Sequence, residues 1–261
     1  MYTVDFLIRR FATPTRHPVP ERELDVLKTG HRFTIPFGFT ELQAWSWGDG
    51  PTIVLSHGWS GRGSQFFKFV RPLLDAGFSV VVYDAPAHGE SPGEMSNYPE
   101  FAKAVREVVE RVDAVGVVGH SFGSMAVGLA LAQGLRPIPA VLLTMPADPR
   151  HYFDLFTQRA GLAPGLKEQM FREIANRLNF DWPNLKASVY APNIKSPALI
   201  LQDPAETAVP WDHATTVAQS WPGAKLVPVH GVGHFKILRT PEVIEQTVEF
   251  LKSKTQGSGR S

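Results

Sequence analysis

The pentapeptide Gly119-His120-Ser121-Phe122-Gly123 carries the clearest chemical signal in the chain. It follows the apolar run AVGVV and opens the helix-like segment SFGSMAVGLALA. The pattern G-x-S-x-G between a strand and a helix predicts a strained turn that points the serine Oγ out of a sheet, where it can act as a nucleophile. The backbone N–H of Phe122 would then face a developing oxyanion, assisted by the positive end of the following helix.

A second amide donor for that oxyanion is expected in Ser56-His57-Gly58-Trp59, which ends the apolar run TIVLS. The backbone N–H of Trp59 is the candidate, and its indole is expected to form part of the pocket wall, although plain core packing would also explain this tryptophan. We expect His57 to shape the turn rather than to act in catalysis.

A serine nucleophile requires a base, and His234 is the best placed of the nine histidines. It follows the run KLVPV and precedes the last helical segment, so it should lie at the same sheet edge as Ser121. His120 is adjacent to Ser121, but neighbouring side chains on such a turn diverge. The acid should follow the run ALILQ and precede His234, within residues 203–210.

Eight short runs rich in β-branched residues predict the strands that position these groups. The later ones are apolar almost throughout, such as TIVLS, SVVVYD and VGVVG, which is typical of strands covered on both faces. Helical periods separate them, so we predict an α/β fold with a mostly parallel eight-stranded sheet flanked by helices and opened by an antiparallel pair. The runs are 31–35, 42–47, 52–56, 79–84, 114–118, 140–144, 198–202 and 225–229.

The alternation of strand and helix fails between residues 144 and 197. A helical stripe (Leu166, Met170, Ile174 and Leu178) indicates a helical insertion there. The predicted organisation is a core over 1–146, a small helical cap over 147–196, the rest of the core over 197–252, and a disordered tail over 253–261.

Composition excludes several other classes of protein. The formal net charge is +1, which argues against a nucleic-acid partner. No apolar run reaches the roughly 20 residues of a membrane span, and no signal peptide is visible. The chain has no cysteine, which excludes thiol chemistry and weakly favours the cytoplasm. Four histidines (His57, His88, His120 and His234) should lie near one sheet edge, but their spacing matches no metal motif, so no metal is expected.

Taken together, these motifs resemble those of a small, lidded bacterial serine esterase with the α/β-hydrolase fold. The resemblance covers roughly residues 31–252 and rests on HGW, YDAPAHGES, GHSFG, Val209-Pro210 and GVGH in the family's order. It implies a triad of Ser121, an acid and His234, an oxyanion hole from the amides of Trp59 and Phe122, a cap, and no cofactor.

The acid is the one departure from the family's pattern. Relatives usually have an aspartate three residues before the Val-Pro pair, where this chain has Glu206. A glutamate is one methylene longer, so it must fold back or shift to reach His234. Glu206 is the favoured acid, with Asp203 and Asp148 as alternatives.

The resemblance implies hydrolysis of a small-molecule ester or acyl substrate by a monomer or homodimer. A thioesterase, a C–C bond hydrolase or a cofactor-free perhydrolase would use the same triad. A non-enzymatic ligand-binding receptor on this scaffold is the alternative of a different class. The residues expected to line the substrate pocket are Trp59, Phe122, Phe153, Phe156 and Trp182, although the last three could equally fasten the cap to the core.

Overall fold

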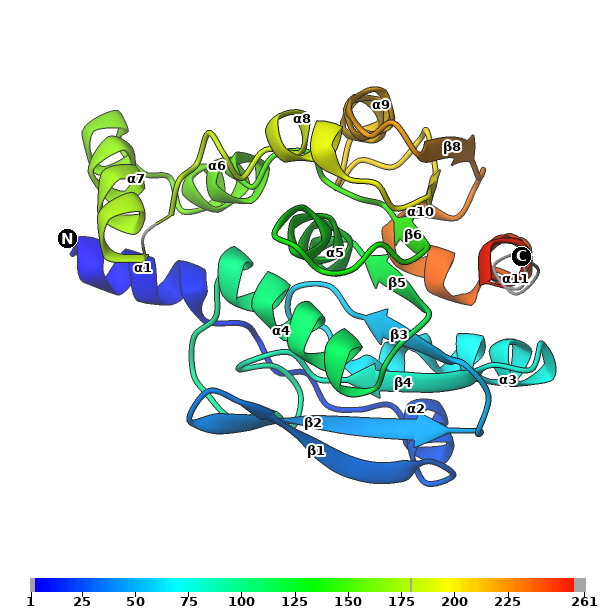
Figure 1. The fold of residues 1–261 in the computed structure, drawn as a ribbon. Helices are drawn as coiled ribbons and strands as arrows, with labels where there is room; N and C mark the ends of the chain where they lie inside the picture. Colours follow the sequence, from blue (N-terminus) through cyan, green and yellow to red (C-terminus); the bar gives the residue numbers. More distant parts are fainter. Residues whose placement is uncertain (1–2, 179, 256–261) are drawn as a thin grey trace.

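Eight strands form one sheet in the computed structural model, which describes residues 3–178 and 180–255. Their order across the sheet is β1-β2-β4-β3-β5-β6-β7-β8 (Figure 1). All eight predicted strands are confirmed, with ends within two residues of the prediction. The bounds are β1 His31–Phe37, β2 Thr40–Trp47, β3 Thr52–Ser56, β4 Ser79–Tyr83, β5 Gly116–His120, β6 Ala140–Leu143, β7 Ala198–Gln202 and β8 Ala224–Pro228.

The sheet is mostly parallel, as predicted. Strand β2 pairs antiparallel with β1 and with β4, whereas every other neighbouring pair is parallel. The carboxyl ends of strands β3 to β8 therefore meet at one edge, which is where ligands bind in sheets of this kind.

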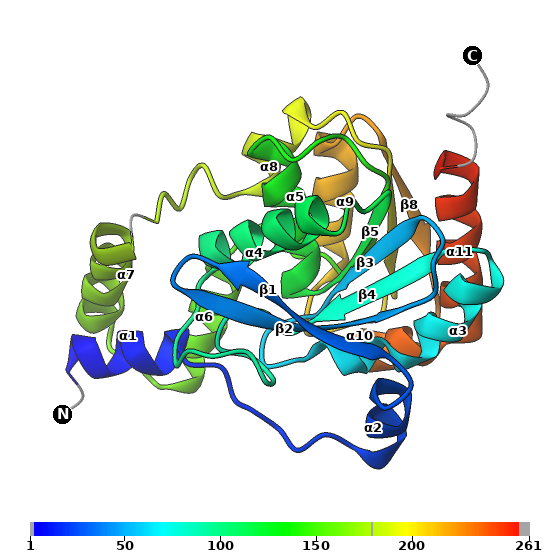
Figure 2. The ribbon, with the colours of Figure 1, turned by 60° about the horizontal axis from the view of Figure 1, so that its bottom comes forward.

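Helices cover both faces of the sheet (Figure 2). None of those described is long and apolar enough to cross a membrane. The helices are α1 Val4–Ala12, α2 Glu21–Leu27, α3 Phe67–Asp75, α4 Tyr98–Arg111, α5 Phe122–Ala132, α6 Arg150–Arg159, α7 Pro164–Leu178, α8 Ala187–Tyr190, α9 Trp211–Ser220, α10 Gly233–Lys236 and α11 Pro241–Thr255, with short 3-10 turns η1 Gly63–Phe66, η2 Ala191–Asn193 and η3 Ile237–Arg239.

Local sequence explains where helix α4 begins and which face it buries. The Asn97 side chain accepts a hydrogen bond from the Glu100 backbone N–H at 3.0 Å, which caps the helix. Phe101, Val105 and Val108, spaced at helical intervals, are fully buried against the sheet. Helix α4 packs beside α5, the helix that follows Ser121.

Two hydrophobic clusters lie on opposite faces of the sheet. One is formed with α4, α5 and α9, and the other with α3, η3 and α11. Helix α5 lies between the sheet and its neighbouring helices, so all its residues from Phe122 to Leu131 are buried. Such burial fixes the helix whose first turn carries the candidate nucleophile.

Helices α6, α7 and α8 lie between β6 and β7, in the segment where the sequence predicts a cap. Met170 and Ile174 of α7 are buried, and α7 contacts α1 from the start of the chain (Figure 1). The expected tail needs one correction. Residues 253–255 form the end of α11, because the helical period that begins at Pro241 continues to Thr255. Residues 256–261 lie outside the described part of the chain.

Candidate active site

Ser121 occupies a strained turn between β5 and α5. Its φ of 54° and ψ of −117° are rare for a residue with a side chain, and its N–H donates to the Leu143 carbonyl at 2.8 Å. A Cβ on Gly119 would lie 2.6 Å from the Cα of Ser124, and one on Gly123 would lie 2.3 Å from the Ser56 carbonyl oxygen. Both flanking positions therefore require glycine, as the G-x-S-x-G pattern predicts.

Two backbone amides are free to hold an oxyanion beside Ser121. Among the described residues, neither the Phe122 N–H nor the Trp59 N–H has a hydrogen-bond partner. The turn that carries Trp59 lies against the serine, because a Cβ on Gly58 would be 3.2 Å from the Ser121 Cβ. The rings of Trp59 and Phe122 lie 5.1 Å apart, edge to face, and form an apolar pair.

His57 shapes this turn, as expected. Its Nε2 accepts the Ala85 N–H at 2.9 Å, so its proton is on Nδ1, which donates to the Gly58 carbonyl at 2.7 Å. Burial lowers the pKa of His57 well below its ordinary value, and nearby His88 lowers it further. The ring is therefore a neutral structural element.

The structure brings Glu206 and His234 together. The Nδ1 of His234 donates to the Glu206 Oε2 at 2.7 Å, and the carboxylate is almost fully buried. The other carboxylate oxygen, Oε1, accepts the backbone N–H groups of Ala208 and Val209. The longer side chain thus folds back onto its own loop and still reaches the histidine.

This arrangement keeps Glu206 ionised. Burial by itself would raise its pKa, but the hydrogen bond and charge of His234 and the amides of Val209 and Ala208 outweigh it, so the pKa of Glu206 lies below its usual value. An ionised carboxylate on Nδ1 fixes the imidazole tautomer in which Nε2 is bare, which is the form that can accept a proton.

The two alternative acids, Asp203 and Asp148, bond groups other than the His234 ring. The Oδ2 of Asp203 accepts the N–H groups of Val232 and Gly233, the two residues before His234, at 2.8 and 2.9 Å. Asp148 accepts the Arg150 N–H at 2.8 Å and pairs with Lys186 at 3.1 Å. Of the three candidates, only Glu206 contacts the His234 ring.

His120 holds the backbone of the His234 turn. Its Nε2 donates to the His234 carbonyl at 2.8 Å, and the two rings lie 5.0 Å apart. Burial and the neighbouring His234 lower the pKa of His120 to about 3, so the ring stays neutral. Through this contact, the residue before Ser121 is joined to the candidate base.

The hydroxyl of Tyr152, on α6, lies 2.9 Å from the Ser121 Oγ. This contact was not anticipated from the sequence. Tyr152 is one of several aromatic residues in the inserted segment, and no spacing signal separates it from its neighbours. Burial raises the pKa of its phenol, so Tyr152 is a neutral hydrogen-bonding group over the serine.

The three aromatic residues expected to line the pocket from the cap make other contacts. Phe153 is fully buried and packs edge to face on Phe11 and Trp182. Phe156 packs on Phe11 at 5.3 Å. Among the described residues, none of the three has a ring contact with Trp59, Phe122 or Tyr152, so these contacts favour the alternative in which they fasten the cap.

Comparison with known proteins identifies the family of the chain. The model of the "Alpha/beta hydrolase family" matches residues 53–247. The chain is 26% identical over 240 residues to "Putative carbamate hydrolase RutD" of Stutzerimonas stutzeri, covering 76% of this chain and 90% of that protein. It is 31% identical over 104 residues to human "Serine hydrolase-like protein", a match that spans 38% of this chain and about half (51%) of the human protein.

Solved structures show the same fold at low identity. The chain superposes on the esterase EaEST of Exiguobacterium antarcticum with a TM-score of 0.68 and 18% identity, covering 85% of this chain and all of that one. It superposes on the Pyrococcus furiosus esterase PF2001 with a TM-score of 0.68 and 19% identity, covering 94% and 98% of the two chains.

Proposed function

The chain belongs to the alpha/beta hydrolase family and is a hydrolase, and we propose that it cleaves carboxylic esters through an acyl-enzyme formed on Ser121. The observation that carries this proposal is the 2.7 Å hydrogen bond between Glu206 and His234, on a histidine whose backbone is joined to the residue before Ser121. A serine, a base and an orienting acid are the three parts that nucleophilic acyl transfer needs.

In the proposed mechanism, the bare Nε2 of His234 takes the proton of the Ser121 hydroxyl as Oγ attacks the acyl carbon. The alcohol then leaves with that proton, and a water molecule, activated in the same way, releases the acid. The Glu206 carboxylate stabilises the imidazolium that forms in both halves. The Tyr152 hydroxyl is hydrogen-bonded to Oγ, so this bond must weaken or break when Oγ attacks the substrate.

The unpartnered amides of Trp59 and Phe122 supply the proposed oxyanion hole. Removing one donor from a site of this kind costs on the order of 10²- to 10³-fold in turnover. Since both donors are backbone groups on buried turns, they need little reorganisation during the reaction. The apolar pair of Trp59 and Phe122 is proposed to line the acyl pocket, where it would suit an uncharged acyl group.

The same triad would attack thioesters, and the name of the Stutzerimonas relative adds carbamates as related acyl substrates. C–C bond hydrolysis and cofactor-free perhydrolysis also use these residues, with different leaving groups or acceptors. Fold and triad alone do not select among them. We favour esters because the motifs of the chain resemble those of bacterial serine esterases.

A chain-length series of nitrophenyl esters, run beside matched thioesters and carbamates, tests the proposal. We expect steady turnover of short esters, with a higher kcat/KM than for the other two classes. Turnover confined to thioesters or carbamates would overturn ester specificity but not the triad. A single burst without turnover would favour the receptor alternative, in which the serine reacts but does not cycle.

A further inference from the structure

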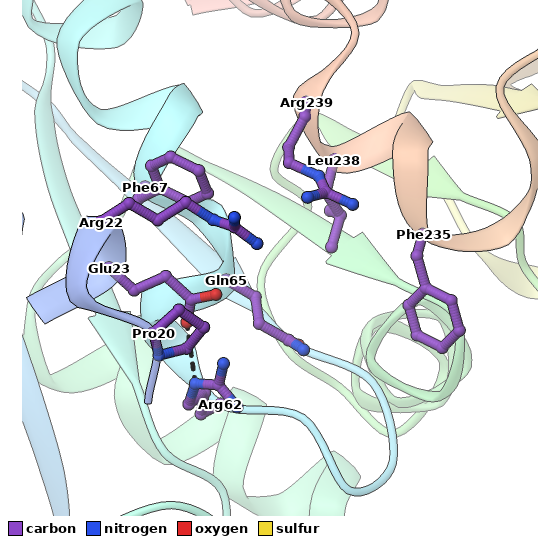
Figure 3. Close-up of a pocket in the computed structure, with 9 residues that line it drawn as sticks. All are labelled: Pro20, Arg22, Glu23, Arg62, Gln65, Phe67, Phe235, Leu238 and Arg239. Carbon is purple, nitrogen blue, oxygen red and sulfur yellow. Dashed lines mark hydrogen bonds and ion pairs between the residues drawn. The ribbon is translucent and has the colours of Figure 1, made fainter. Parts of the chain in front are cut away.

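A cavity of about 220 Å³ lies outside the inserted helices, beside the turn that carries His234. Its walls come from α2, the η1–α3 segment and the α10–η3 segment, and one of them is formed by Phe235, the residue after His234 (Figure 3). The proposed ester chemistry does not use this cavity.

Three arginines line the cavity, and together they carry more positive charge than their surroundings neutralise. Arg62 pairs with the buried Glu23, its Nε lying 2.8 Å from the carboxylate. Arg22 and Arg239 have no ion-pair or hydrogen-bond partner among the described residues. Figure 3 shows both of their guanidinium groups pointing into the same space. The local excess is therefore two positive charges.

Arg62 is the most informative of the three because it is only 7% exposed. Its Nε is used by Glu23, but neither Nη has a hydrogen-bond partner within the described part of the chain. These Nη groups are not among the buried polar atoms of the described residues. They are open to solvent and stay available to an oxygen acceptor.

The remaining lining is apolar or amide. Phe67 lies under the Arg22 guanidinium at 5.9 Å, and Phe235 and Leu238 form the opposite side. In Figure 3 the Gln65 amide reaches toward Phe235. Such a lining suits a flat apolar group whose charged end meets the arginines.

We propose that this cavity binds a small organic phosphate, with the phosphoryl group held by Arg22, Arg62 and Arg239 and a flat apolar part between Phe67 and Phe235. Phosphate is favoured over carboxylate because a phosphomonoester carries a charge of about −1.5 to −2 at neutral pH, which matches the local excess, and has three terminal oxygens for three guanidinium groups.

Titration calorimetry on the full chain tests this site, with phenyl phosphate as the probe. We expect binding with a Kd of about 1 mM or tighter, weaker binding of benzoate and inorganic phosphate, and no binding of phenol. The proposal does not depend on Ser121 chemistry, because phenyl phosphate is not a carboxylic ester.

The double variant Arg22→Gln/Arg239→Gln should weaken phenyl phosphate binding by at least about tenfold, since each loses a charge-assisted donor. Both side chains are exposed, so the variant should fold, which a thermal melt checks. The double variant Arg111→Gln/Arg172→Gln, which changes two exposed arginines on α4 and α7 and removes the same charge, is the matched control. Unchanged affinity in the double variant, equal loss in the control, or benzoate binding more tightly than phenyl phosphate would overturn the proposal.

Discussion

The phenolic oxygen of Tyr152 lies 2.9 Å from the Oγ of Ser121, so the inserted helix α6 touches the proposed nucleophile directly. The same Oγ must bond to His234 when it reacts. The hydroxyl of Tyr152 therefore competes for the atom on which the chemistry depends.

We predict that Tyr152→Phe speeds the covalent labelling of Ser121 by a fluorophosphonate. The lost neutral hydrogen bond is worth about 0.5–1.5 kcal/mol, which corresponds to an increase of roughly two- to tenfold. Labelling rates measured by quenched time courses give the answer. Tyr190→Phe, which removes a phenol bonded to Tyr98 instead, should leave the rate unchanged. Slower labelling of the Tyr152 variant would mean that the phenol assists the attack.

Glu206→Gln should lower kcat by about 10²- to 10³-fold. The change keeps the size of the side chain but removes the charge that stabilises the imidazolium. An aspartate in this role is worth on the order of 10⁴-fold, and a longer side chain orients the ring less strictly. Steady-state kinetics on a nitrophenyl ester measure the loss.

Asp203→Asn is the matched control, because Asp203 bonds the amides of Val232 and Gly233 rather than the ring of His234. It should lower the melting temperature, and it should lower kcat by much less than Glu206→Gln does. If Asp203→Asn loses far more activity than Glu206→Gln at equal stability, Glu206 is not the acid.

Glu206→Asp should also lose activity, by about tenfold or more. The sequence alone left open whether an aspartate, the usual residue here, would match the parent. In the structure one carboxylate oxygen of Glu206 bonds the amides of Ala208 and Val209, and the other bonds His234. Aspartate is one methylene shorter, so its carboxylate would not reach both sets of partners in the same loop conformation. A displaced orienting group costs activity even when its charge is kept. Activity equal to that of the parent would show that the loop adapts.

Folding stability should fall steeply with acid below about pH 6.5. His57, His88 and His120 are buried with lowered pKa values, to about 4 for His88 and about 3 for His120. The unfolded chain thus binds three protons that the folded chain does not. Burial raises the pKa of Asp84 to about 6, so this group binds a proton in the folded state first and offsets one of the three.

A net uptake of about two protons on unfolding predicts a loss of roughly 3 kcal/mol per pH unit near pH 5. Urea unfolding at pH 7.5, 6 and 5 measures this slope. A free energy of unfolding that is flat over this range would show that the histidines take up protons within the fold.

Phe153→Ala should act mainly on stability. The ring is fully buried and packs on Phe11 and Trp182, so its loss should cost about 3–5 kcal/mol. We expect the ester chain-length profile to keep its shape at a temperature where the variant is folded. A shifted optimum, measured on the same nitrophenyl series, would instead assign Phe153 to the acyl pocket.

Most of the sheet was predictable from the sequence because its central strands, β3 to β7, are nearly continuous apolar runs bounded by turn residues. The turn at Ser121 was predictable because Gly119 and Gly123 occupy positions where a Cβ would clash with neighbouring backbone atoms. Contacts that depend on tertiary packing could not be predicted from the sequence. Tyr152 reaches Ser121 only because α6 packs beside the β5–α5 turn, and the reach of Glu206 depends on how residues 203–209 fold.

The aromatic residues of the cap also show that sequence alone does not predict tertiary contacts. Residue type alone left open whether Phe153, Phe156 and Trp182 line the pocket or fasten the cap. In the structure the rings of Phe153 and Phe156 pack on Phe11 in α1, a helix about 140 residues earlier in the chain. Aromatic composition predicts that such residues are buried, but it does not predict against which element.

Intact-mass measurement after fluorophosphonate treatment tests the central claim most directly. We predict one adduct per parent chain, located at Ser121 by peptide mapping, and none on Ser121→Ala at an unchanged melting temperature, with ester turnover lost in parallel. An adduct retained on Ser121→Ala, or ester turnover that survives the substitution, would contradict the proposal that Ser121 is the nucleophile.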